Sequence, residues 1–284
     1  MRIESDLHRQ LGTMVAYGFP KVELGDDLKL ASRLGAQILE ILPDWRTLPD
    51  PLLLRKQVED AGFAIHSAHG CWGSQAIQAN RVDLGSLEPE AQRQSIDDLR
   101  RCIDWLSAAA GRCLVVHPGG LSSPSDAERR QEALASGLVA LARHAEGTEV
   151  IVCVENMPPG VHPGSRMNDL FHLVNRLGHA GIALALDTGH AHIAAQVETE
   201  TLAAGSLLRT THVHDNDGRQ DSHLAPRSGT IDWEAWARSL DRIDYDGPIM
   251  LECVRYLRQF PETLNEEFLA SLKRLCVRSR MATE

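Results

Sequence analysis

Residues 181–190 read GIALALDTGH, a short apolar run that ends in a carboxylate and is followed directly by threonine, glycine and histidine. In a β-strand, Ala183, Ala185 and Asp187 would point to one face, because side chains alternate between the two faces of a strand. Small alanines below an aspartate are what the crowded interior of a β-barrel would accommodate. The stretch therefore predicts a strand whose last residue, Asp187, lies at the mouth of a barrel.

Apolar runs of this kind recur along the chain and alternate with longer helical patterns. Several helical patterns begin with Asp or Pro and end in Gly, as helix caps prefer. Continuous apolar strands that alternate with helices indicate a parallel sheet covered on both faces. Eight such units predict an α/β fold, the (β/α)8 TIM barrel, with a doubly wound open sheet as the alternative. The expected strands are residues 13–17, 37–42, 63–69, 112–117, 149–155, 182–187, 209–214 and 248–253.

The length of 284 residues agrees with a single domain over residues 1–284, because α/β barrels reach this size as one unit. Hydrophobic residues make up 43% of the chain and charged residues 24%, which is ordinary for a soluble globular protein. The formal net charge is -10, from 29 Lys and Arg against 39 Asp and Glu. Since binding to phosphate backbones depends on Lys and Arg, nucleic acid is not the expected partner.

The sequence shows no targeting or membrane segment. The N-terminal residues 1–18 contain no apolar region of the kind that a secretory signal needs, and no run approaches eighteen consecutive apolar residues. The six cysteines form no CxxC pair, and Cys113, Cys153 and Cys253 lie in apolar runs, where reduced and buried thiols are expected. We therefore expect a cytoplasmic protein without a membrane partner.

Potential metal ligands close six of the eight expected strands. The carboxyl ends of barrel strands ring the mouth, where the chemistry of TIM barrels takes place. Any one of these residues alone would be an ordinary loop-facing residue, but three buried carboxylates at one mouth would repel each other unless a cation lay among them. The combination predicts a metal site. The six residues are His69, His117, Glu155, Asp187, His214 and Glu252.

The motifs that carry these residues resemble, in order and spacing, the xylose-isomerase-like superfamily of TIM barrels. That superfamily includes sugar and sugar-phosphate isomerases and epimerases, and also the zinc-dependent abasic-site endonucleases. The resemblance covers roughly residues 66–253. The motifs are HSAHG (66–70), VVHPGG (115–120), VENMP (154–158), LDTGH (186–190), HVHDND (212–217), DSHL (221–224), GTIDW (229–233) and MLEC (250–253).

The resemblance implies four core metal ligands: Glu155, Asp187, His214 and Glu252. We prefer His214 to His212 because HDND fits the family's His-x-x-Asp pattern better, and His212 is the reserve ligand or a substrate contact. Both histidines should point inward. Three oxygen ligands and one imidazole suit a divalent cation, Mn²⁺, Zn²⁺, Mg²⁺ or Co²⁺, and the ligand types do not choose among these four.

In the endonuclease branch, further residues hold a three-zinc cluster. Asp221 and His223 are two residues apart, so both could face one ion if the segment were extended. The segment ENMPPGVHPG, which begins at Glu155, looks more like the isomerase and epimerase branch. The endonucleases have a small, Gln- and Gly-rich loop at this place. The residues here that match the additional zinc ligands are His69, His117, His190, Asp221 and His223.

Four other residues are assigned less specific roles. After DSHL the family usually has a glycine-rich segment, but this chain reads APRSG and places Arg227 there. Arg227 is either a surface arginine or a group at the mouth that holds a carboxylate or phosphate of the substrate. Trp72 could cover a sugar ring. His66 and His192 are expected to pack or to support the ligands.

The first hypothesis for the function is a metal-dependent isomerase or epimerase of a sugar or polyol, which abstracts a proton next to a carbonyl through a metal-stabilised enediolate. The resemblance gives the acid and base roles to Glu155 and Glu252, and His190 would hydrogen-bond a substrate oxygen if it holds no metal. The alternatives are a zinc-dependent abasic-site endonuclease, a related dehydratase and a barrel that only binds. Barrels of this class often form homodimers, although the sequence leaves the oligomeric state open.

Overall fold

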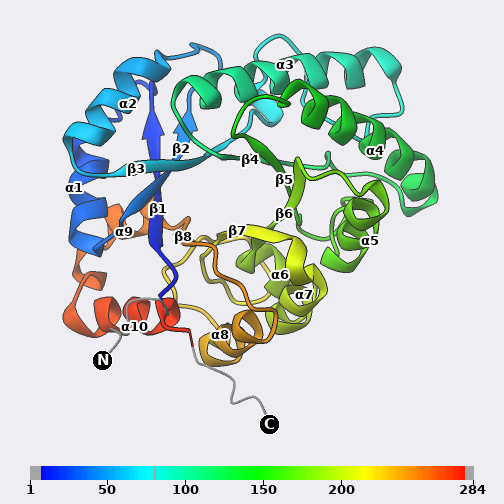
Figure 1. Ribbon diagram of the computed structural model, residues 1–284. Coiled ribbons are helices and arrows are strands. Elements are labelled where there is room, and N and C mark those ends of the chain that lie inside the picture. The colour runs from blue at the N-terminus through cyan, green and yellow to red at the C-terminus, as the bar shows by residue number, and fades with distance from the viewer. Residues whose placement is uncertain (1–7, 80, 279–284) are drawn as a thin grey trace, which may run out of the picture.

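The computed structural model describes residues 8–79 and 81–278. The first seven residues, on which the expected absence of a secretory signal partly rests, and the last six residues of the expected domain lie outside the described residues. Figure 1 shows a ring of strands with helices packed around its outside. The strands are β1 (Leu11–Tyr17), β2 (Ile38–Pro43), β3 (Ala64–His69), β4 (Cys113–Val116), β5 (Ile151–Glu155), β6 (Ile182–Asp187), β7 (Leu208–His212) and β8 (Ile249–Leu251).

The eight strands form one parallel sheet in the order β7-β6-β5-β4-β3-β2-β1-β8. The two ends of this sheet meet where β7 and β8 run side by side. The Val213 amide donates to the Met250 carbonyl at 2.8 Å, and the Glu252 amide donates to the Val213 carbonyl at 3.0 Å. The sheet is therefore a closed (β/α)8 barrel, which confirms the predicted fold over the doubly wound alternative.

Helices follow the strands and cover the outside of the barrel (Figure 1). Asp50 caps α2 by accepting hydrogen bonds from the amides of Leu52 and Leu53, and Asp232 caps α8 by accepting one from Ala235, as their positions in the sequence suggest. The helices are α1 (Leu24–Leu34), α2 (Pro51–Asp60), α3 (Pro89–Ala108), α4 (Ala127–His144), α5 (Met167–Leu177), α6 (Thr188–Ala194), α7 (Val197–Ala204), α8 (Trp233–Arg242), α9 (Val254–Gln259) and α10 (Glu266–Cys276). Short 3-10 turns are η1 (Gly73–Gln75), η2 (Pro124–Asp126), η3 (Gly205–Leu207) and η4 (Pro261–Thr263).

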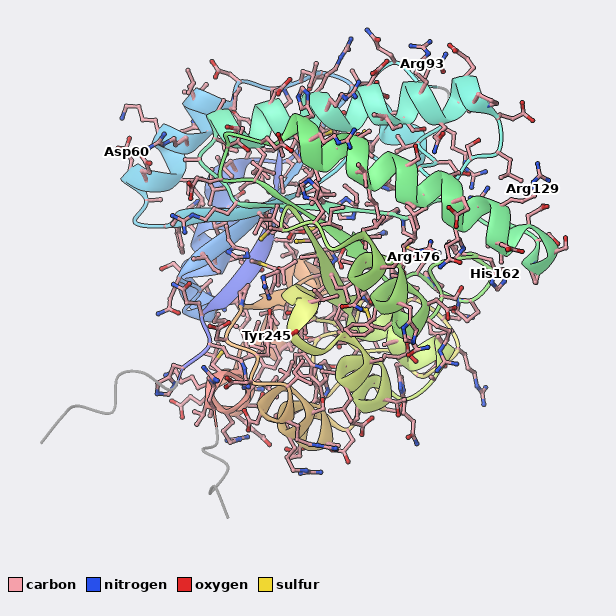
Figure 2. All side chains as sticks on the ribbon, turned by 45° about the vertical axis from the view of Figure 1, so that its right-hand side comes forward. Asp60, Arg93, Arg129, His162, Arg176 and Tyr245 are labelled. Atoms are coloured by element: carbon pink, nitrogen blue, oxygen red, sulfur yellow. The ribbon has the colours of Figure 1, made fainter. Side chains whose placement is uncertain are left out.

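The hydrophobic core has two parts. The larger part lies between the sheet and the helices and consists mainly of aliphatic side chains. The smaller part contains Cys113, Val115, Cys153, Ala183 and Ala185, which share the inward face of their strands, as the alternation of the sequence predicts. Charged side chains project outward from the helices (Figure 2).

All six cysteines are buried free thiols, in agreement with the sequence-based expectation for Cys113, Cys153 and Cys253. In the described part of the chain, no helix is both long enough and apolar enough to cross a membrane. Above the inward-facing alanines of β6, Asp187 ends the strand at the mouth, where the other candidate ligands also lie. The barrel thus has an apolar interior below and a polar mouth above.

Candidate metal centre

Four side chains meet at the barrel mouth: Glu155, Asp187, His212 and Glu252. Each offers a ligand atom, and these four atoms lie within 4.8 Å of one another. Glu155, Asp187 and His212 end β5, β6 and β7, and Glu252 directly follows β8. His212 Nδ1 lies 2.8 Å from Glu155 Oε1 and 3.2 Å from Glu252 Oε2. We call these four residues the inner group.

The structure brings His212, the reserve ligand of the sequence analysis, into this group and places His214 in another. β7 ends at His212, and its inward side chain meets the carboxylates, whereas His214 lies two residues beyond the strand and its Nε2 contacts Asp187 Oδ2 at 2.9 Å. The His-x-x-Asp spacing also fits His212 and Asp215. Asp215 is buried and accepts a hydrogen bond from Trp233 Nε1 at 2.9 Å, which anchors the loop after β7.

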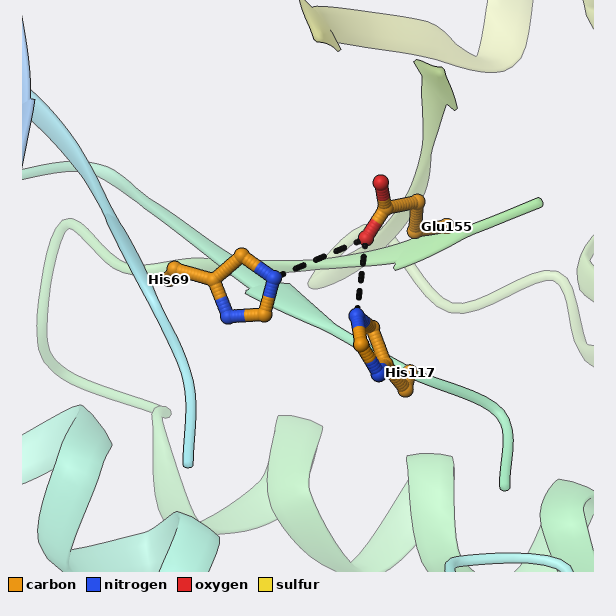
Figure 3. A group of neighbouring side chains, drawn as sticks. All are labelled: His69, His117 and Glu155. Carbon is orange, nitrogen blue, oxygen red and sulfur yellow. Dashed lines mark ion pairs between the residues drawn. The ribbon is translucent and has the colours of Figure 1, made fainter. Parts of the chain in front are cut away.

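Glu155 also faces a second group of candidate ligands. Its Oε2 lies 3.3 Å from His117 Nε2 and 3.8 Å from His69 Nε2 (Figure 3). This oxygen is buried, and it accepts no hydrogen bond of good geometry from a described residue. A buried carboxylate oxygen without a hydrogen bond is costly. An oxygen held between two imidazole nitrogens fits a cation, so the side chains present are suited to a metal ion.

An outer group is formed by His214, Asp221 and His223, whose ligand atoms also lie within 4.8 Å of one another. His223 Nε2 lies 3.3 Å from Asp221 Oδ2, and the rings of His214 and His223 stack with their centroids 4.0 Å apart. His190 Nε2 approaches the same Asp221 oxygen at 3.2 Å. His223 has a φ of 45°, so the segment is not extended, yet both side chains face the same point. Its Nδ1 donates to the Glu252 carbonyl, which leaves Nε2 directed toward Asp221.

The turn between β6 and α6 requires the glycine of the LDTGH motif. Asp187 Oδ1 accepts a hydrogen bond of 2.6 Å from the amide of His190 and caps α6. A Cβ atom on Gly189 would lie 2.0 Å from Cε1 of His214. Only glycine therefore allows the His214 ring to pack over this turn and reach Asp187.

Glu40 supports the inner group and was missed by the sequence analysis. This β2 residue is fully buried, its Oε1 lies 2.7 Å from His212 Nε2, and its Oε2 accepts a hydrogen bond of 2.5 Å from Ser67. The β2–β3 register shifts at Leu39 and Glu40 so that His66 is an extra residue in β3, and Glu40 pairs with Ser67. The signal in the sequence was a single glutamate inside the apolar run 37–42.

Asn156 is a second missed residue, and it joins two neighbouring strand ends. Its side-chain oxygen accepts from the Asp187 amide at 2.8 Å, and its side-chain nitrogen donates to the Asp187 carbonyl at 3.0 Å. Its own carbonyl accepts a hydrogen bond of 2.8 Å from His190 Nδ1. Asn156 therefore fixes Asp187 and His190 relative to Glu155, which precedes it in the chain.

The carboxylates of the mouth favour protonated imidazoles. Burial opposes protonation of His190, but nearby carboxylates, Asp187 first, outweigh it and raise the pKa of His190 to about 10. The pKa of His223 rises to about 10 in the same way, because a hydrogen bond to Asp221 and neighbouring charges outweigh burial. In contrast, burial lowers the pKa of His69 to about 4. Protons on these histidines compensate the negative charge of the buried carboxylates, and a bound divalent cation can compensate the same charge.

The remaining predicted residues lie in different places. Trp72 lines the same cavity as His69, with the two rings in an edge contact at 4.8 Å. Arg227 lies outside the cavities that hold the candidate ligands: it pairs with Glu234 at 2.5 Å and lines a groove beside α8 and α10. The structure thus does not bring Arg227 together with the candidate ligands. His192 Nε2 lies 2.8 Å from Thr230 Oγ1.

Sequence comparisons place the chain among related barrels. The model of a family described as "Xylose isomerase-like TIM barrel" matches residues 28–275. The uncharacterized protein MJ1614 of Methanocaldococcus jannaschii is 26% identical over 163 residues, which are 57% of this chain and 63% of that protein. The probable endonuclease 4 of Mycoplasmopsis synoviae is 29% identical over 185 residues, 60% of this chain and 65% of that protein. The matched segment thus spans less than two thirds of either relative.

Solved structures extend the likeness over nearly the whole chain. A D-tagatose 3-epimerase-like protein has a TM-score of 0.74 and 19% sequence identity, and the match covers 92% of this chain and 98% of that one. An L-ribulose 3-epimerase has a TM-score of 0.74 and 17% identity, with coverage of 96% and 100%. At these identities the likeness shows the fold alone.

Proposed function

Because the chain belongs to the xylose isomerase-like TIM barrel family, we propose that it is a divalent-metal-dependent isomerase or epimerase of a sugar or polyol. The observation that carries the proposal is the inner group, in which Glu155 and Glu252 reach one potential cation site from strand ends that are separated by β6 and β7. The epimerases among the similar structures support the choice of reaction. The substrate would be a small carbonyl compound with hydroxyl groups.

The inner group would hold the ion through Glu155, Asp187, His212 and Glu252, a set of three carboxylates and one imidazole. Such a set suits Mn²⁺, Zn²⁺, Mg²⁺ or Co²⁺. When bound, the cation supplies a Lewis acid for the substrate carbonyl and offsets the charge of the enediolate. The three carboxylates and His212 would hold the cation at the barrel mouth. Trp72 would cover one side of the substrate.

Glu155 and Glu252 would move the proton. Burial raises the pKa of Glu252, whereas His212 and His117 outweigh burial and hold the pKa of Glu155 well below its usual range. Two carboxyl groups whose pKa values are separated in this way suit an acid and a base in one reaction. We propose that Glu155 takes the proton from the carbon next to the carbonyl and that Glu252 returns one. His190 would donate a hydrogen bond to a substrate oxygen.

A panel of ketoses, polyols and keto-inositols, assayed with added Mn²⁺, tests this proposal. Substitution of Glu252 by Gln keeps the size of the side chain but removes the carboxylate, so we expect turnover to fall by about a thousandfold or more. Glu59→Gln on the exposed face of α2 is the matched control and should behave like wild type. Retained turnover in E252Q would refute the role of Glu252.

The second candidate is a zinc-dependent abasic-site endonuclease. It is favoured by the three groups of candidate ligands, because they could hold more than one ion, and by the similarity to a probable endonuclease 4. The net charge of -10 disfavours it, since DNA binding depends on basic residues. Three zinc ions per chain together with nicking of abasic duplex DNA would establish the endonuclease and exclude the isomerase or epimerase.

A further inference from the structure

A second cavity adjoins the one that contains the candidate ligands. The inner cavity, of about 340 Å³, is bordered by His69, His117, Glu155 and His190. The second, which we call the outer cavity, has a volume of about 680 Å³. Volumes of this order hold small-molecule ligands. The two cavities share six lining residues: Met14, Leu42, Trp72, Asp221, His223 and Glu252.

The shared lining means that a molecule bound at the metal centre can extend into the outer cavity. The outer cavity continues from Glu252 along α9, which begins two residues after Glu252, and reaches Asp27 on α1. Its lining there includes the polar side chains of Tyr256 and Gln259. A simple sugar at the metal centre would leave this second space unfilled, so the substrate has room for a further polar group.

Asp221 and Glu252 line the outer cavity but belong to the candidate metal groups, and the remaining charges of this cavity indicate the sign of that polar group. Asp27 is buried, accepts a hydrogen bond of 3.0 Å from the Ala16 amide and forms an ion pair with Arg258. The negative charge of Asp27 is therefore balanced inside the protein. Arg255 lines the same cavity and is exposed, and within the described part of the chain no ion pair joins it to another residue. Its guanidinium group is thus available to a ligand.

We propose that Arg255 binds an oxyanion at the far end of the substrate, so that the preferred substrate is a sugar phosphate or a sugar acid rather than a neutral sugar. This inference rests on the proposed function for the reacting end of the substrate. A guanidinium group holds the oxygens of a phosphate or carboxylate in a bidentate way, and both sources of the anion share this chemistry. Arg255 follows Glu252 by three residues, which places the anion contact and the reacting end on one β8–α9 connection.

Equilibrium binding to the full chain as purified tests the proposal without relying on turnover. The probes are D-fructose, D-fructose 6-phosphate and D-glucuronate, and the variants are Arg255→Gln and, as a matched control, Arg129→Gln. Arg129 is an exposed arginine that projects from α4 at the periphery (Figure 2). We expect wild type and R129Q to bind at least one anionic sugar about tenfold more tightly than D-fructose, and R255Q to lose this difference. The anion that gains the tighter binding identifies phosphate or carboxylate.

Three results would overturn the proposal: unchanged anion preference in R255Q, equal binding of neutral and anionic sugars, or no binding of any probe. Turnover measured in parallel separates this inference from the proposed function. If anion binding depends on Arg255 but no sugar is converted, the anion site stands and the isomerase or epimerase fails. If neutral sugars are converted and R255Q does not change anion binding, the proposed function stands and the anion site fails.

Discussion

The inner and outer groups of candidate ligands differ in what supports them. Glu155, Asp187 and His212 of the inner group are strand residues, hydrogen-bonded to neighbouring strands, and their side chains are buried. In the outer group, Asp221 and His223 lie on the loop after β7, and their side chains are 32% and 36% exposed. His223 adopts a left-handed backbone conformation there, which is uncommon outside glycine.

This difference in structural support corresponds to different roles for the two groups. The barrel itself fixes the inner group, so these residues are suited to the bond-breaking chemistry that needs precise positions. Two members of the outer group, Asp221 and His223, lie on the loop after β7, and loops can change without disturbing the barrel. We infer that the inner group carries the reaction and that the outer group decides how many ions bind, and so which reaction class results.

The largest expected effect distinguishes the two groups directly. Glu155→Gln removes a carboxylate that belongs to the inner group and also faces His69 and His117. We therefore expect turnover to fall by about a thousandfold or more and the metal content to drop. Asp221→Asn should remove metal from the outer group only, with turnover reduced by less than about tenfold. Metal analysis and turnover of both variants, with E59Q as the control, provide the check. Equal loss of turnover in E155Q and D221N would contradict the division of roles.

Glu40→Gln tests the support of the inner group. The Glu40 carboxylate accepts a hydrogen bond from the N–H at His212 Nε2, which leaves Nδ1 directed toward the other carboxylates. A glutamine amide can instead donate to Nε2 and favour the opposite tautomer. We expect metal affinity to fall by about 10–100-fold. Titration calorimetry measures the affinity, and ¹⁵N NMR of labelled histidine reports the tautomer. Ser67→Ala removes only the other hydrogen bond of Glu40 and should have a smaller effect on metal affinity. Unchanged metal affinity in E40Q would mean that Glu40 does not support the inner group.

The smallest effect concerns the turn between β6 and α6, on which the His214 ring packs. Gly189→Ala places a Cβ against His214, so the ring must move, and we expect a loss of about 1–3 kcal/mol in the free energy of unfolding. Urea denaturation gives this value. Gly25→Ala on α1 is the control, because no atom lies within 4 Å of its added Cβ, and it should not destabilise the chain. Wild-type stability in G189A would mean that the packing of His214 on the turn is not required.

The barrel could be predicted from the sequence because its signal repeats locally. Every expected strand coincides with an observed one, and residues 182–187 match β6 at both ends. Alternation along β6 correctly placed Ala183, Ala185 and Asp187 on the inner face. Strand-end carboxylates could be found for the same reason, since an acidic residue after an apolar run marks the mouth.

The rest depends on contacts that the sequence does not display. The choice between His212 and His214 depends on where β7 ends, and the prediction extended this strand by two residues. Glu40 meets His212 across the barrel, 172 positions away in the chain. Arg227 turned out to pair with Glu234 on α8, which a loop motif alone does not indicate. Such long-range pairings decide the roles of individual polar residues.

The most direct test of the central claim is deuterium incorporation from D₂O, measured by mass spectrometry on ketoses incubated with the metal-loaded protein. We expect that one deuterium enters the carbon next to the carbonyl, that chelation of the metal stops this exchange and that E155Q, which lacks the proposed base, does not show it. Two results would contradict a metal-dependent isomerase or epimerase: no deuterium in any ketose while the same preparation nicks abasic DNA, or unchanged exchange after the metal is removed.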